Sequence, residues 1–111
     1  MKNILLIATG GTIASRPTQN GLTPQLRAED ILGCVPSLVS LCRIDALQLM
    51  NIDSTNMSPD NWLHIAACVR ERYDGYDGFV ITHGTDTMAY TASALAYLIQ
   101  QSSKPIVLTG S

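Results

Sequence analysis

The chain has 111 residues, of which 46% are hydrophobic and 14% charged, and its formal net charge is -2. This length fits one compact domain, and the apolar share excludes wholesale disorder. The 7 Lys and Arg residues are scattered and form no basic patch for nucleic acid. The apolar run Ile4–Ala8 is far shorter than the ~20 residues of a membrane helix. Three cysteines without CxxC spacing indicate neither a disulfide framework nor a zinc knuckle, so we expect a soluble cytoplasmic domain.

The first predicted element is a buried strand. Asn3–Ala8 is a continuous apolar run that stops at a pair of glycines, a pattern typical of a strand buried on both faces of a parallel sheet. The polar stretch Ser15–Gln25 contains two prolines and a glycine and predicts a mobile surface loop. We expect a short helix over Ala28–Cys34 and a second strand over Arg43–Met50.

A clear helix start follows the second strand. Ser58 is a suitable N-cap, Pro59 suits the first helical position and Asp60 places an acid in the first turn. Apolar residues at helical spacing predict one buried stripe, made by Trp62, Ile65, Ala66, Val69 and Tyr73. This helix should end at Asp74-Gly75.

The remaining elements are two strands and one helix. Phe79–Ile81 and Pro105–Leu108 are short apolar runs that predict strands. Between them, a helix capped by Asp86 or Thr87 should run to about Gln100, and its nearly all-apolar surface should pack against a sheet or a partner. Strands alternating with helices predict an α/β domain with an open, mostly parallel sheet flanked by helices, Rossmann- or flavodoxin-like.

Small, hydroxyl-rich clusters follow all four predicted strands. They are Thr9–Thr12, Asp53–Asn56, Thr82–Thr87 and Thr109–Ser111. In open parallel sheets the ligand crevice lies at the carboxyl ends of the strands, so the four clusters should face one crevice. Gly and Thr in ordinary turns would explain one such cluster, but several at equivalent positions predict a binding site.

Threonine is the best-equipped catalytic group in these clusters. The sequence has no GxSxG, GxxxxGK[ST] or GxGxxG motif. A threonine acts as a covalent nucleophile when a neighbouring base removes its proton, and Thr12 and Thr85 are both placed for this role. Backbone N–H groups at Gly11, Thr12 or near Thr85 could hold an oxyanion. Asp86 suits a substrate amine, although helix capping explains it equally well.

Two segments, Thr9–Ala14 and His83–Met88, resemble the signature segments of the bacterial-type L-asparaginase family. Gly78–Thr82 and Lys104–Ser111 also match, and Asn51–Ser54 resembles the substrate-binding segment in the form typical of cytoplasmic members. The likeness spans essentially the whole chain. It implies that residues 1–111 are the N-terminal part of an asparaginase fold, an incomplete domain that lacks the family's second domain.

The resemblance also implies roles for individual residues. Thr12 would be the nucleophile that takes the acyl group from the side-chain amide and releases ammonia, after which water hydrolyses the acyl-threonine. Thr85 and Asp86 would belong to a second catalytic group, which is Thr-Lys-Asp in the family. Thr85 would assist proton transfer and the oxyanion, while Asp86 would also hold the α-amino group.

For substrate binding, the resemblance implies that Ser54 holds the α-carboxylate together with the backbone around Gly11 and Asp53. The substrate would be L-asparagine or L-glutamine, which differ by one methylene worth only about 1–3 kcal/mol of discrimination. The family implies no metal and no organic cofactor, and it suggests a homo-oligomer at full length.

Two departures from the family pattern bear on activity. Leu22 stands where many members carry a tyrosine that activates the nucleophile. The family's catalytic lysine lies beyond the stretch that Thr109–Ser111 matches, and Lys104 does not replace it. We therefore expect that these 111 residues alone do not catalyse appreciably.

Two other functions remain open. The related glutamyl-tRNA amidotransferase component, which acts on glutamine, shares both signatures but carries an extra domain ahead of the first one; because the first strand here begins at Asn3, that function is disfavoured. A non-catalytic binding or interaction module that keeps the amino-acid crevice is the alternative from a different class.

Other chemical groups have simpler explanations. Asp60, His64 and Cys68 repeat every four residues, but a fourth ligand is missing and their face should lie opposite the buried stripe, so we expect no metal site. His83 is expected to be a packed, hydrogen-bonded ring. We interpret the larger aromatic residues as core or interface anchors (Trp62 and Tyr73) and as a candidate subunit contact (Tyr90 and Tyr97).

Overall fold

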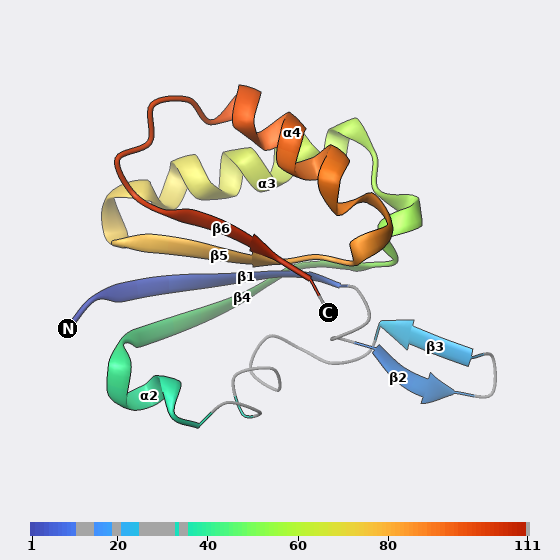
Figure 1. Cartoon of the computed structure of the whole chain (residues 1–111), viewed down its shortest axis with the longest axis horizontal. Helices are drawn as coiled ribbons and strands as arrows, with labels where there is room; N and C mark the ends of the chain where they lie inside the picture. The colour runs from blue at the N-terminus through green and yellow to red at the C-terminus, as the bar shows by residue number, and fades with distance from the viewer. Residues whose placement is uncertain (11–14, 19–20, 25–32, 34–35, 111) are drawn as a thin grey trace.

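A four-stranded parallel sheet forms the centre of the molecule (Figure 1). The computed structural model describes residues 1–10, 15–18, 21–24, 33 and 36–110. The strands are β1 (Asn3–Gly10), β4 (Arg43–Ile52), β5 (Gly78–Thr82) and β6 (Ile106–Thr109), in the order β4-β1-β5-β6. All pairings between them are parallel, which confirms the predicted α/β class.

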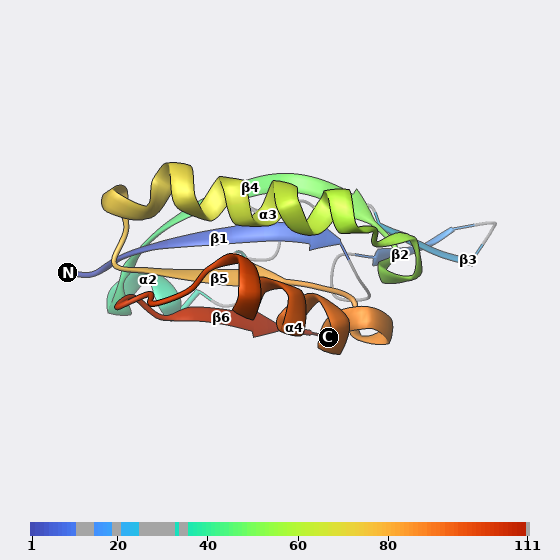
Figure 2. The same ribbon diagram turned by 90° about the horizontal axis from the view of Figure 1, so that it is seen from above.

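Two helices cover one face of this sheet, α3 (Pro59–Arg72) and α4 (Met88–Leu98) (Figures 1 and 2). The start of α3 is as predicted. Pro59 is at the first helical position, and the N–H and hydroxyl of Ser58 donate to Oδ1 of Asn61 at 2.9 and 2.8 Å. No helix in the described part of the chain is long and apolar enough to cross a membrane.

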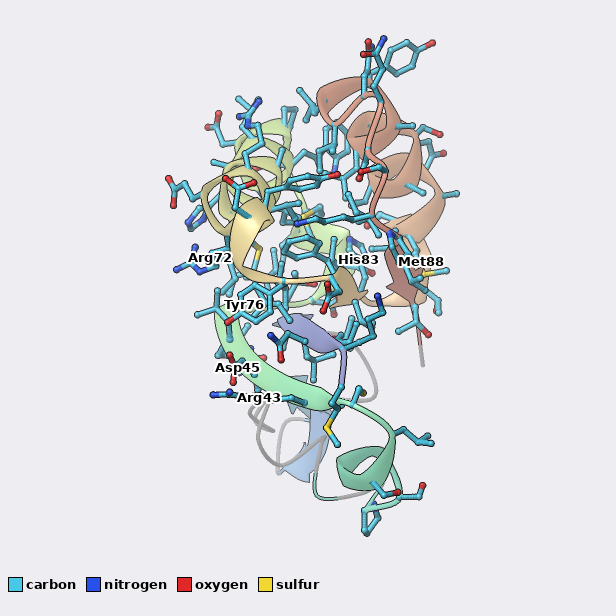
Figure 3. All side chains as sticks on the ribbon, turned by 90° about the vertical axis from the view of Figure 1, so that its left-hand side faces the viewer. Arg43, Asp45, Arg72, Tyr76, His83 and Met88 are labelled. Carbon is cyan, nitrogen blue, oxygen red and sulfur yellow. The ribbon has the colours of Figure 1, made fainter. Side chains whose placement is uncertain are left out.

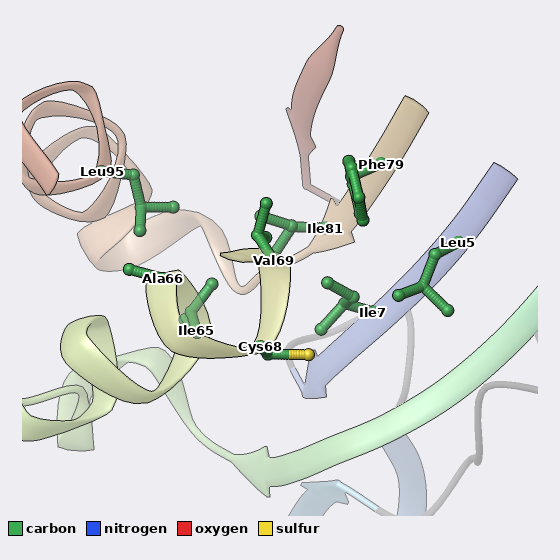
Figure 4. Packing of buried hydrophobic residues seen from close by; sticks show 9 residues of the cluster. All are labelled: Leu5, Ile7, Ile65, Ala66, Cys68, Val69, Phe79, Ile81 and Leu95. Atoms are coloured by element: carbon green, nitrogen blue, oxygen red, sulfur yellow. The ribbon is translucent and has the colours of Figure 1, made fainter. Parts of the chain in front are cut away.

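The main core lies between these helices and the sheet (Figure 4). Alternate residues of β1 and β5 face the helices, and α3 presents its apolar stripe to them. The buried members are Leu5, Ile7, Ile65, Ala66, Cys68, Val69, Phe79, Ile81 and Leu95. Burying a Leu, Ile or Phe side chain contributes about 1.5–3 kcal/mol, so this one cluster provides most of the force that holds the helices on the sheet.

The opposite face of the sheet has a smaller apolar cluster. Leu6 and Ala8 are buried there, and Ile44, Ala46 and Val80 pack against them. A four-residue helix, α2 (Leu38–Leu41), lies next to β4 on this side (Figure 1).

The predicted surface loop over Ser15–Gln25 is wrong. The structure has an antiparallel hairpin of β2 (Ser15–Thr18) and β3 (Gly21–Pro24). An Asn-Gly pair stands at the start of β3, where Asn20 precedes Gly21, and such a pair is a hairpin signal that the loop-like composition obscures. Both strands of an isolated hairpin are edge strands, which tolerate the prolines. The helix predicted over 28–34 lies outside the described residues, apart from Gly33.

Tyr73, predicted as an anchor, joins the end of α3 to the sheet. Its ring stacks on Phe79 with centroids 6.0 Å apart, and Lys104 Nζ lies 4.6 Å from the ring centroid and donates to the Tyr73 carbonyl at 2.6 Å. The Tyr73 hydroxyl bonds to Ser102, which lowers the pKa of the phenol. Lys104 is therefore held at the amino-terminal end of β6, away from the predicted crevice.

A second tyrosine closes the same end of the sheet. Tyr76 donates its hydroxyl to Asp45 Oδ2 at 2.7 Å, so it ties the segment before β5 to the start of β4 (Figure 3). This hydrogen bond to a carboxylate raises the pKa of the Tyr76 hydroxyl.

Replacing Ile7 by Ala should destabilise the fold by roughly 2–5 kcal/mol, because Ile7 is 0% exposed in the central strand and its truncation leaves a cavity between sheet and helices. Urea unfolding followed by circular dichroism measures the change. Leu41→Ala is the matched control, since Leu41 is 71% exposed and its truncation should change stability by less than about 0.5 kcal/mol. Equal losses in the two variants would contradict this assignment of the core.

Candidate active site

The carboxyl ends of the four strands meet as the sequence predicts. The register pairs Gly10 with Ile52, Ala8 with Thr82 and Thr82 with Thr109, so the residues that follow each strand start from one edge of the sheet. Gly11 and Thr12 come directly after β1 but lie outside the described residues. The other predicted site residues, Asp53, Ser54, Thr85 and Asp86, are all in short turns at this edge.

Gly10 marks the closest approach between two strand ends. Its φ is +115°, and a Cβ on this residue would collide with the backbone carbonyl of Ile52. The β1–β4 register also shifts between Ala8 and Gly10. Only glycine is compatible with both the positive φ and the close approach, so the end of β1 requires glycine at this position.

Ser54 lies in a 3₁₀ turn, η2 (Ser54–Asn56), directly after β4. Asp53 caps this turn by accepting a hydrogen bond from the Thr55 N–H at 3.1 Å. Asp53 is exposed, whereas Ser54 is only 3% exposed. The cap explains why a polar residue follows β4 here, and it sets the position of Ser54.

A second 3₁₀ turn, η4 (Thr85–Thr87), follows β5 and carries Thr85 and Asp86, both exposed. Thr87, one of the two predicted caps, occupies the N-cap position of α4, but its side chain makes no capping hydrogen bond. Its hydroxyl donates instead to the Ser54 carbonyl at 2.7 Å. This bond joins the two turns that carry the predicted substrate-binding residues.

The end of β6 packs closely against η4. A Cβ on Gly110 would lie 2.7 Å from the methyl carbon of Thr85 and 3.2 Å from the Met88 sulfur. Figure 3 shows Met88 and His83, the neighbours of this contact, in the same part of the molecule. The close approach leaves no room for a side chain, and it positions Thr85 from the β6 side.

Buried polar groups lie directly beneath these turns. Thr9 donates its hydroxyl to the Thr82 carbonyl at 2.6 Å, which joins the ends of β1 and β5. His83 is 0% exposed, and its ring nitrogens bond to the Gly84 carbonyl and to Thr91. The structure thus confirms that His83 is a packed, hydrogen-bonded ring.

The Thr82 hydroxyl differs from these bonded groups. Thr82 Oγ1 has no hydrogen-bond partner among the residues that the structure describes, although the residue is 3% exposed. It lies at the same strand end as the predicted site.

The prediction that Cys68 lies on a surface opposite the buried stripe is wrong. Cys68 is 2% exposed and belongs to the main core, and burial raises the pKa of its thiol. A neutral buried thiol is a poor metal ligand. Within the described ranges, no three His, Cys, Asp or Glu residues are grouped so that they could hold a metal ion.

Three residues that shape this site, Thr87, Thr91 and Gly110, are not among the predicted site residues. The periodicity of α4 contains a signal for Thr91, because it lies four residues before Leu95 on the buried side of the helix. A hydroxyl at such a position needs a buried partner. Thr87 and Gly110 lie in two of the predicted clusters, but their individual roles depend on contacts between distant segments, for which the sequence has no local signal.

A family model described as Asparaginase, N-terminal matches residues 3–111. The chain belongs to the asparaginase family. It is 46% identical to an L-asparaginase of Thermococcus kodakarensis over 97% of this chain and 33% of the relative. It is also 41% identical to a glutamyl-tRNA(Gln) amidotransferase component of Archaeoglobus fulgidus, over 99% of this chain and 27% of that relative.

Solved asparaginase structures share the fold. The T. kodakarensis enzyme superposes with a TM-score of 0.82 at 43% identity, covering 98% of this chain and 34% of that chain. A probable cytoplasmic L-asparaginase of Campylobacter jejuni gives a TM-score of 0.84 at 37% identity, covering 99% of this chain and 32% of that one. This asparaginase-family chain therefore spans about a third of the length of these relatives.

Gly10→Ala should destabilise the asparaginase domain by about 3 kcal/mol or more, because the new Cβ meets the Ile52 backbone at a φ that L-residues avoid. Chemical unfolding measures the loss. Gly75→Ala is the control, since nothing lies within 4 Å of its Cβ position, and it should stay within about 0.5 kcal/mol of the parent. A tolerated Gly10→Ala would refute the close approach of β1 and β4.

Proposed function

We propose that the protein to which this chain belongs hydrolyses the side-chain amide of L-asparagine to L-aspartate and ammonia. The observation that carries the proposal is the Thr87–Ser54 hydrogen bond of 2.7 Å, which joins a turn suited to the α-carboxylate to a turn that carries a hydroxyl and a carboxylate. Membership of the asparaginase family and the similarity to enzymes named L-asparaginase support it.

In the proposed reaction Thr12 is the nucleophile. Its oxygen attacks the amide carbon, its proton passes to the leaving nitrogen, and ammonia departs to leave an acyl-threonine ester. Water then attacks the ester, which returns the proton to Thr12 and releases aspartate. Neither half-reaction needs a cofactor to balance.

The described residues are assigned the remaining roles. Asp86 is an exposed carboxylate in η4, and we assign it to the α-amino group of the substrate. Thr85, beside it, assists proton transfer, and backbone N–H groups at the turn stabilise the oxyanion. Ser54, together with the backbone around Gly11 and Asp53, receives the α-carboxylate.

Glutamine hydrolysis is the second candidate. The amidotransferase relatives are 41% to 45% identical to this chain, close to the 46% of the asparaginase. The sequence of this domain therefore supports amide hydrolysis more strongly than it supports either asparagine or glutamine as the substrate. The ratio of kcat/KM for asparagine and glutamine distinguishes the two.

In the full-length protein, ammonia release from asparagine should depend on Thr12 and Asp86. Thr12→Ala removes the nucleophile and should lower kcat by at least about 10³-fold, and Asp86→Asn should lower kcat/KM by about 10²-fold or more. Asp74→Asn is the control, because Asp74 is an exposed carboxylate at the opposite end of β5, and it should stay within about twofold of the parent.

Three outcomes separate the candidate functions. Thr12-dependent ammonia from asparagine supports the proposal, and Thr12-dependent ammonia from glutamine alone supports the amidotransferase type. Calorimetric binding of aspartate that Asp86→Ala abolishes, without product from either amide, would instead indicate a non-catalytic amino-acid-binding module.

We also propose that the full protein is a cytoplasmic homo-oligomer. Tyr90 and Tyr97 are 68% and 79% exposed on α4, which suits a subunit contact. Sedimentation velocity should show an oligomer, and Tyr97→Asp should weaken it if this helix takes part. A monomer at all concentrations would contradict the proposal.

A further inference from the structure

Three buried or half-buried side chains are joined in series beneath the η4 turn. Trp62 Nε1 lies 2.9 Å from Thr91 Oγ1, and the same oxygen lies 2.8 Å from His83 Nε2. His83 Nδ1 lies 2.6 Å from the Gly84 carbonyl oxygen. Thr91 and His83 are both 0% exposed, so neither of them can exchange its partner for bulk water.

One direction satisfies every group in the series. The indole N–H of Trp62 can only donate, so Thr91 Oγ1 accepts from it. The Gly84 carbonyl can only accept, so His83 Nδ1 carries a proton and donates. Thr91 then gives its own hydroxyl hydrogen to His83 Nε2, and every donor and acceptor is satisfied by a neutral ring with its proton on Nδ1.

The last bond of the series acts on a peptide group of the proposed active site. The Gly84 carbonyl and the Thr85 N–H belong to one planar peptide unit and point in opposite directions across it. A hydrogen bond that holds the carbonyl therefore also fixes the direction of the Thr85 N–H. Gly84 itself, as glycine, restrains this peptide less than a residue with a side chain would.

The other contacts of η4 do not replace this bond. Thr87 ties the carboxyl-terminal end of the turn to Ser54, and Gly110 packs against the Thr85 methyl group. Neither contact bonds to the Gly84–Thr85 peptide. Among the side chains of the described residues, His83 is therefore the one that bonds to this peptide, and the ring of His83 is bonded in turn to Thr91.

We propose that Thr91 is a positioning residue for amide hydrolysis: acting through His83, it holds the Gly84–Thr85 peptide with its N–H aimed for the oxyanion. This inference rests on the proposed function. Thr91 touches no substrate; its hydroxyl is the one group in this series that both accepts from Trp62 and sets the tautomer of His83. A misdirected N–H stabilises the transition state less while the substrate contacts of Asp86 and Ser54 persist.

Thr91→Val tests this directly, because valine keeps the shape of the side chain and removes the hydroxyl. In the full-length protein, the kcat for ammonia release from asparagine should fall roughly 10- to 100-fold, with a change in KM of no more than about threefold. Thr91→Ser restores the hydroxyl and should recover kcat to within about threefold of the parent. Ser93→Ala, which removes an exposed hydroxyl from the same helix, is the matched control and should leave kcat unchanged.

A purely structural role predicts a different result. Thr91→Val would then lower the melting temperature but keep the parent kcat at temperatures where the variant is folded, and that outcome would overturn the proposal. So would a Thr91→Ser variant that is as impaired as Thr91→Val.

A spectroscopic readout separates failure of this inference from failure of the proposed function. In the unmodified protein, the ¹⁵N resonances of His83 should report a neutral ring with its proton on Nδ1; a proton on Nε2 alone would overturn the series of bonds even if Thr91→Val does not fold. Thr91→Val should also shift the amide resonances of Gly84 and Thr85, which Ser93→Ala leaves in place. Absence of amide hydrolysis in the parent protein would refute the proposed function without altering these resonances.

Discussion

The parallel pairing of β1 with both β4 and β5 is the constraint on which the rest of the structure depends. β1 has a partner on each side, and its residues from Leu5 to Gly10 are buried. Because the strands are parallel, each one delivers its following loop to the same edge, and side chains far apart in sequence become neighbours there. The main core then needs only α3 and α4 on one face to hold that edge in place. The geometry of the proposed site is thus a consequence of strand direction before any catalytic group is considered.

A second feature of the fold is that the exposed residues of η4 are positioned mainly through their neighbours. Thr85 and Asp86 are exposed in η4, where the proposed function assigns them to the substrate. Their neighbours are anchored instead: His83 in the core, Thr87 on the Ser54 carbonyl and Gly110 against the Thr85 methyl group. Buried polar side chains are costly unless fully bonded, and such a series of bonds specifies one arrangement of the turn over alternatives.

Much of this arrangement can be predicted from the sequence, and the remainder has identifiable physical reasons. Short apolar runs locate three of the four sheet strands, the strand over Arg43–Met50 is also predicted, and Ser58-Pro59 locates the start of α3, because these signals are local. The hairpin of β2 and β3 escapes prediction because its prolines and polar residues are typical of a loop. The prediction for Cys68 is wrong because the buried arc of α3 is wider than a narrow stripe. The bonds of Thr87 and Trp62 join residues that are distant in the chain, and no spacing rule reveals them.

The strand order also has a consequence for how the chain folds during synthesis. The central strand is made before both of its neighbours, since Leu5 pairs with Asp45 on one side and with Phe79 on the other. This apolar segment of the nascent chain therefore cannot complete both of its pairings until β5 has been synthesised. Such non-local pairings fold slowly and leave apolar strands exposed to other chains in the meantime. A topology that gathers four strand ends at one edge thus slows folding, and it leaves β1 exposed to association with other chains until its neighbours are made.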